Sequence, residues 1–192
     1  MKNNKVITGE LFTALDDATG ELVTLVEPVD ENEFNVIPFK DSWTVAQLAV
    51  HVTKSNKAIV QGLGMPGMPP NRDPEEKAPH LKKMFLDFSA KYQSPAFIVP
   101  EMHIYDKNEV VHELKHSIEQ LNLLRFKTNL EEIIELPVFG EITKLELLHF
   151  VSYHTQRHIH QLKKILAAIS NSSRNRRSSA SISRQTRSRV RC

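Results

Sequence analysis

Cysteine is almost absent from this sequence, because its 192 residues include only one, Cys192. A single thiol cannot form an internal disulfide, which indicates a reducing compartment. The N-terminal residues lack the apolar run of a signal peptide, and no window approaches the roughly 18 apolar residues that a membrane span needs. We therefore expect a soluble, cytoplasmic protein with no membrane segment.

Glycine and aromatic residues are also scarce, at 6 glycines and 7% aromatic side chains. Scarce glycine combined with long segments of helical periodicity favours helices over a sheet-rich fold. The chain has 40% hydrophobic and 25% charged residues, which is typical of a globular protein with a substantial core.

Acidic residues are missing from residues 170–192, which contain seven arginines and many serines. Residues 1–169 carry 18 basic against 23 acidic residues, a net charge of −5 that does not favour nucleic-acid binding. The C-terminal segment has almost no apolar content to offset the entropy of ordering, so we expect a disordered Ser/Arg-rich tail.

Two interpretations of this tail stay open. An arginine-rich arm could bind RNA or another anionic surface. Alternatively, residues 170–192 are a solvated tail without a role, or an artefact of the expressed or translated sequence. The abrupt change in composition and the lack of an aromatic residue for base stacking favour the second interpretation.

Four long segments have apolar residues at the spacing of amphipathic helices: residues 9–27, 45–62, 107–127 and 144–169. Three of them begin with a capping pattern, in which Thr44, Asp106 or Thr143 precedes a Gln or Glu by three positions. These features predict an all-α protein whose residues 1–169 form one four-helix bundle domain.

A proline-rich excursion, residues 63–106, separates the second and third predicted helices. Its seven prolines prevent one continuous element, although a short helix is predicted over residues 79–90. A second connector, residues 128–142, is predicted to contain a turn. Long excursions in compact domains are often functional.

The strongest candidate site lies on the last predicted helix, where His154 and His158 are four residues apart. One helical turn separates them, so both imidazoles point the way the apolar stripe points. A buried histidine needs partners for both ring nitrogens. Hydrogen bonds inside the core would meet that need, and so would a shared metal ion.

A third metal ligand would have to come from another helix. His51 is the best candidate, because it lies at the inner edge of the second predicted helix, and metal sites in bundles use side chains from facing helices. The other histidines with a pattern are predicted to face solvent: His112, His116, His149 and His160.

Three motifs together resemble those of a known family. One is Trp43-Thr-Val-Ala-Gln-Leu-Ala-Val-His51, in which a Trp and a capped helix precede a His. The second is His154-Thr-Gln-Arg-His158-Ile-His-Gln161, which reads H-x-x-x-H-x-x-Q on the last helix, and the third is Leu136-Pro-Val-Phe-Gly140-Glu-Ile-Thr143, which precedes that helix. Over residues 8–168 the chain thereby resembles the DinB-like (YfiT-like) superfamily, in which the His of the first motif binds a metal.

The resemblance implies a four-helix bundle in which His51, His154 and His158 hold a divalent metal, usually zinc or nickel. It also implies a small-molecule substrate and a homodimer. Characterised relatives include bacillithiol-type S-transferases, which use a low-molecular-weight thiol, and a mycothiol-dependent maleylpyruvate isomerase. This chain departs from the family where His158-Ile-His160-Gln161 replaces the frequent His-Arg-Gly-Gln, and it shows no thiol-binding pattern.

An ion held by three histidines keeps an open position. It could lower the pKa of a bound water toward about 7 for hydrolysis, or bind and deprotonate a substrate thiol for transfer. Gln161 could orient a ligand or that water, unless it is simply a half-exposed helix residue. Arg157 could pair with a substrate carboxylate, unless it is a surface arginine.

The sequence therefore predicts a metal-dependent enzyme, with an S-transferase preferred over a hydrolase. The alternative is a non-catalytic helical bundle with a structural metal or a stress-related binding role.

Overall fold

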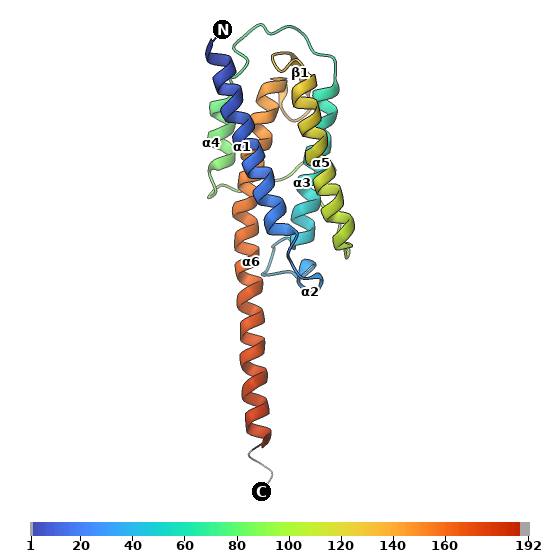
Figure 1. The fold of residues 1–192 in the computed structure, drawn as a ribbon, viewed down its shortest axis with the longest axis vertical. Helices are drawn as coiled ribbons and strands as arrows, with labels where there is room; N and C mark the ends of the chain where they lie inside the picture. The colour runs from blue at the N-terminus through green and yellow to red at the C-terminus, as the bar shows by residue number, and fades with distance from the viewer. Residues whose placement is uncertain (1, 189–192) are drawn as a thin grey trace.

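The computed structural model describes residues 2–188, and four long helices form its bundle (Figure 1). These helices are α1 (Lys2–Val26), α3 (Val45–Gly64), α5 (Lys107–Lys127) and α6 (Lys144–Ser188). The shorter helical elements are α2 (Glu31–Phe34), α4 (Ala78–Leu86) and a 3-10 turn, η1 (Ala96–Ile98). The predicted all-α four-helix bundle is therefore confirmed. None of the helices over residues 2–188 combines the length and apolar character that a membrane crossing requires.

Two predicted capping boxes fix the first turns of α3 and α6. At α3, the hydroxyl of Thr44 accepts from the Gln47 N–H, and the side chain of Gln47 accepts from the Thr44 N–H, both at 3.1 Å. At α6, Thr143 and Glu146 exchange the same pair of bonds at 3.0 Å. Both caps satisfy backbone donors that a helix start would otherwise leave unpaired. They set the phase of the two helices that carry the candidate histidines.

The core consists of two clusters of buried apolar side chains, and α3 and α6 contribute to both. One cluster includes Leu22, Leu48 and Leu162, and the other includes Leu15 and Leu148. Along α6, the residues of the second cluster end at position 151 and those of the first begin at position 159. The candidate histidines on α6 therefore lie between two apolar clusters.

The connector over residues 128–142 contains a β-hairpin that the sequence did not indicate. Strand β1 (Ile133–Leu136) pairs antiparallel with β2 (Gly140–Thr143), with Leu136 opposite Gly140. Gly140 has a φ of +62°, a conformation that glycine adopts without a steric penalty. Met68 of the excursion pairs with Ile133, which adds a contact between segments far apart in the sequence. Strands of four residues depend on such partners, so local periodicity does not predict them.

Some predicted boundaries shift in the structure. Helix α1 begins at Lys2 rather than near residue 9, and α4 ends at Leu86 rather than near residue 90. The predicted disorder from residue 170 is not confirmed over residues 170–188, where α6 continues beyond the end of the bundle (Figure 1). That stretch has no glycine or proline to end a helix, although it lacks an apolar stripe. Residues 189–192 lie outside the described residues.

Candidate metal centre

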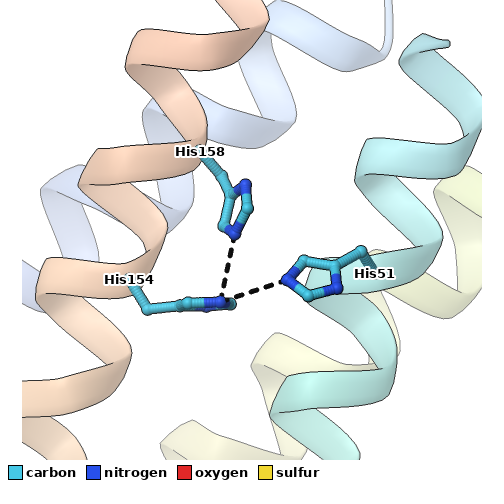
Figure 2. Close-up of side chains that lie close together, drawn as sticks. All are labelled: His51, His154 and His158. Atoms are coloured by element: carbon cyan, nitrogen blue, oxygen red, sulfur yellow. Dashed lines mark hydrogen bonds between the residues drawn. The ribbon is translucent and has the colours of Figure 1, made fainter. Parts of the chain in front are cut away.

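Three histidines meet between α3 and α6 (Figure 2). The Nε2 atom of His154 lies 3.2 Å from Nε2 of His51 and 3.0 Å from Nε2 of His158. One nitrogen from each ring lies within 4.8 Å of the other two. The structure thus brings together the three residues that the sequence singles out.

Helix geometry accounts for this convergence. His51 lies two turns beyond the Thr44 cap of α3, and His154 and His158 lie one turn apart on α6. All three side chains are buried, with exposed fractions of 1%, 6% and 7%. The site is therefore formed by two rigid helices rather than by mobile loops.

The outer ring nitrogens of two histidines already have hydrogen-bond partners. Nδ1 of His51 lies 3.0 Å from the carbonyl oxygen of Ile98, which can only accept, so Nδ1 carries the proton. Nδ1 of His158 lies 3.1 Å from Oε1 of Gln161 and likewise donates. In a neutral imidazole the second nitrogen is then a bare lone pair. Both lone pairs face Nε2 of His154.

A divalent cation fits this arrangement better than hydrogen bonds do. A proton on Nε2 of His154 could be donated to only one of its two neighbours, and the other pair of nitrogens would stay unsatisfied. In a tetrahedral zinc site with Zn–N bonds of 2.0–2.1 Å, the ligand nitrogens lie about 3.3 Å apart. The observed separations of 3.0 and 3.2 Å are close to that value.

Burial keeps these histidines neutral, which is the form that binds a metal. It lowers the pKa of His158 from 6.5 to about 3. Burial also lowers the pKa of His154 far below its usual range, and the charges that His158 and His51 would carry lower it further. The pKa of His51 is lowered by burial as well, although its bond to Ile98 partly opposes the shift.

Aromatic rings pack against the histidines. The ring centroid of Trp43 lies 4.7 Å from that of His51 and 6.3 Å from that of His158. Phe150 stacks against His154 at 5.0 Å. Charges and dipoles interact more strongly in such a desolvated environment than in water.

A pocket of about 820 Å³ opens onto the three histidines. Its apolar lining includes Phe85, Phe139 and Phe150, and its polar lining includes Gln161. Pockets of this size accommodate small organic molecules. The site therefore combines a candidate ion site with space for a ligand beside it.

A match to a protein-family model shows which family this chain belongs to. The DinB superfamily model matches residues 14–162. The chain belongs to the DinB superfamily. Uncharacterised protein YuaE of Bacillus subtilis (strain 168) is 23% identical over 158 residues, which cover 80% of this chain and 96% of YuaE.

Two solved structures are similar to this DinB superfamily member in fold. TT2238, described as a four-helix bundle protein, has a TM-score of 0.53 and 18% identity, and the match covers 81% of this chain and 98% of TT2238. YfiT from Bacillus subtilis has a TM-score of 0.50 and 19% identity, and the match covers 82% of this chain and 84% of YfiT. YfiT is described as a probable metal-dependent hydrolase with an unusual four-helix bundle topology.

Arg157 lines the pocket and also contacts backbone, so its pairing with a substrate carboxylate stays a prediction. Its guanidinium donates to the carbonyl oxygens of Phe85, Asp87 and Ala90, and it lies 5.1 Å from the ring centroid of Tyr92. Arg157 therefore holds the segment that follows α4 against α6. Its position between His154 and His158 in the sequence links that segment to the candidate metal centre.

His149 is buried, so the prediction that it faces solvent is wrong. Its exposed fraction is 8%. Its Nε2 atom lies 2.6 Å from Glu75 Oε1, and its Nδ1 atom lies 3.2 Å from the Tyr153 hydroxyl. The proline-rich excursion covers this face of α6, a contact that helix periodicity cannot indicate. His160, also predicted to face solvent, is half-buried and stacks on the ring of Phe88 at 4.3 Å.

The two histidines predicted on α5 lie at the surface, as expected. The side chains of His112 and His116 are 77% and 50% exposed.

Proposed function

We propose that this chain is a metal-dependent enzyme in which His51, His154 and His158 hold a divalent ion, zinc or nickel. The observation that carries the proposal is the convergence of three buried imidazoles at an open pocket, two of them with lone pairs fixed inward. The description of YfiT as a probable metal-dependent hydrolase supports it. When bound, such an ion supplies Lewis acidity to a ligand in the pocket.

The protein's own groups prepare the site for that ion. The carbonyl of Ile98 and the side chain of Gln161 orient two of the rings by accepting their Nδ1 protons. Trp43 and Phe150 pack against the histidine rings. Because these groups are fixed before a ligand binds, little reorganisation is required when it does.

Within this function we favour transfer of a low-molecular-weight thiol over hydrolysis. Among the described residues that line the pocket, the one carboxylate is Asp41, which is exposed. Activation of water in a metal hydrolase benefits from a nearby general base. A thiol, whose pKa of about 8.5 is far below that of water, depends less on such a base.

Metal content is the first test of the proposal. Purified protein titrated with zinc or nickel is expected to bind one ion per chain, as measured by plasma mass spectrometry after gel filtration. His154→Ala is expected to abolish binding, and His112→Ala, which removes an exposed histidine, is the matched control. If the unaltered protein binds neither ion, the proposal is wrong.

A second measurement separates an enzyme from a bundle that uses metal only for stability. X-ray absorption on the zinc-loaded protein is expected to show three histidine nitrogens and an exchangeable light atom, whereas a fourth protein ligand would indicate a structural site. Turnover of bacillithiol with monochlorobimane would then support thiol transfer, and turnover of 4-nitrophenyl acetate without a thiol would support hydrolysis.

A further inference from the structure

The pocket is positively charged although the rest of the domain is acidic. Its lining contains three cationic side chains, Lys91, Arg157 and Lys164, and the single acidic residue Asp41. Residues 1–169 as a whole carry 18 basic and 23 acidic residues. A local reversal of sign in a concave site attracts ligands of the opposite charge, here anions.

The polarity of the pocket changes along α6. Five of the α6 residues that line it follow one another along the helix in this order: Phe150, His154, His158, Gln161 and Lys164. With a rise of 1.5 Å per residue, Phe150 lies about 6 Å before His154, and Lys164 lies about 9 Å beyond His158. Lys164 thus lines the pocket about one turn beyond Gln161 on the same helix.

The apolar end of the pocket is an aromatic cluster. The ring centroids of Phe85 and Phe139 lie 5.0 and 4.9 Å from that of Phe150, both in edge-on geometry. Val138, which is 52% exposed, adds an aliphatic side chain from the hairpin. These four side chains are uncharged and offer contact area for an apolar group.

Lys164 is the pocket cation that α6 places beyond the histidines. Arg157 already donates to three backbone carbonyls. The neighbouring Lys163 pairs with Glu21 at 2.6 Å and does not line the pocket. Among the described residues, no carboxylate forms an ion pair with Lys164.

We propose that the pocket binds substrates that combine an apolar body with an anionic group such as a carboxylate. The body lies on the cluster of Phe85, Phe139 and Phe150, and the anion lies near Lys164. The part of the ligand between them passes the three histidines. The reaction there rests on the function proposed above, but recognition of the two ends requires no metal.

The test uses a charged and an uncharged ligand of the same shape, 6-phenylhexanoate and 6-phenyl-1-hexanol. Binding to the full chain is measured by calorimetry, with the protein as purified and after treatment with a chelator. We expect 6-phenylhexanoate to bind at least about tenfold more tightly at low ionic strength. That advantage is expected to shrink in 0.5 M NaCl, because salt screens exposed charges.

Matched substitutions locate the two ends of the ligand. Lys164→Gln is expected to weaken 6-phenylhexanoate roughly threefold to tenfold and to leave 6-phenyl-1-hexanol unchanged. Lys163→Gln, which removes the adjacent cation outside the pocket, is expected to change neither. Val138→Ser is expected to weaken both ligands by a similar factor.

Three results would overturn the proposal: no binding of either ligand, equal affinities for the two, or equal effects of the two lysine substitutions. Loss of the preference for 6-phenylhexanoate after chelation would also overturn it, since the ion rather than Lys164 would then hold the carboxylate. If the preference survives chelation while the protein binds no zinc or nickel, the proposed metal function fails and the ligand class stands.

Discussion

At the scale of single residues, the direction in which each imidazole presents its lone pair decides what the site can bind. His158 illustrates this, because its Nδ1 atom meets Gln161 and its Nε2 atom meets His154. The Gln161 contact spans three residues of one helix, so the sequence could suggest it. The carbonyl of Ile98, which orients His51, comes from a 3-10 turn 47 residues away and could not be predicted.

Loss of the Gln161 amide is expected to weaken metal binding without unfolding the protein. Gln161→Leu leaves Nδ1 of His158 without its acceptor, and changes to such supporting groups typically lower metal affinity about 10- to 100-fold. The measurement is zinc affinity by competition with a chromogenic chelator. Gln156→Leu is the control, because Gln156 bonds to Ser152 instead. Equal affinities in the two variants would show that Gln161 does not support the site.

The buried histidines are also expected to make the metal-free protein sensitive to mild acid. The unfolded chain takes up protons near the usual pKa of 6.5, whereas the folded chain resists protonation because burial lowers the pKa of His158 to about 3. The free energy of unfolding therefore falls as the pH drops below 6.5, since the unfolded state binds more protons. Above that pH, these groups are neutral in both states and contribute no pH dependence.

Urea unfolding of chelator-treated protein at pH 7.5, 6.5 and 5.5 measures this effect. For one histidine that stays neutral, the loss between pH 6.5 and 5.5 is about 1 kcal/mol. His158→Gln is expected to reduce the total loss by that amount, because glutamine does not titrate. An unchanged pH dependence in the variant would contradict the prediction.

At the scale of elements, the start of α6 is the point where the proline-rich excursion attaches. The carboxylate of Glu146 accepts from both terminal nitrogens of Arg72 at 2.7 Å and from the backbone N–H of Lys77 at 2.7 Å, besides capping Thr143. Burial alone would raise the pKa of Glu146, but these bonds outweigh it and hold that pKa below its usual value. One carboxylate thus joins the excursion, the hairpin and α6.

Removal of this carboxylate is expected to destabilise the whole domain. Glu146→Ala removes the carboxylate partner of the Arg72 guanidinium, which keeps only its bond to the Asp73 carbonyl, and leaves two buried backbone donors without an acceptor. Breaking such a buried ion pair costs about 3–5 kcal/mol. Urea denaturation at pH 7 measures the loss. Lys57→Gln breaks the exposed pair with Glu113 and is the control, with an expected change below about 1 kcal/mol. A loss for Glu146→Ala as small as the control's would mean that water replaces these bonds.

The elements differ in how far the sequence predicts them. Residues 107–127 were predicted as a helix and form α5 over the same range, because its apolar spacing and its Asp106 cap are local features. The hairpin of β1 and β2 and the burial of His149 were not predicted. Both depend on the excursion, through Met68 and Glu75, and those contacts join segments more than 60 residues apart.

At the scale of the whole molecule, the bundle and the extension of α6 are expected to be energetically separate. Ile169, which is 2% exposed, is the last residue of the buried apolar clusters in the described part of the chain. Beyond it, α6 continues past the end of the other helices (Figure 1). Most helical stability in proteins comes from packing of an amphipathic face, and the sequence of residues 170–188 has no apolar stripe.

Truncation tests that separation. A chain ending at Ser172 is expected to keep its thermal midpoint within about 2 °C of the full chain, because it retains the buried clusters. A chain ending at Leu166 also loses Ile169, and burial of such a side chain contributes about 2 kcal/mol or more, so its midpoint is expected to fall by several degrees. A large fall in the first variant would assign the extension to the folded domain.

The positions of the three histidines have a consequence for the unfolded chain. His51 and His154 are separated by 103 residues, so an ion shared between them would act as a cross-link that closes a loop over more than half of the sequence. In the chain-entropy treatment, closing a loop of about 100 residues contributes about 4–5 kcal/mol when the link persists in the unfolded state. The chain has one cysteine and cannot form an internal disulfide, but an ion shared by α3 and α6 would cross-link these helices in a comparable way. A chelator, rather than a reductant, would break that link.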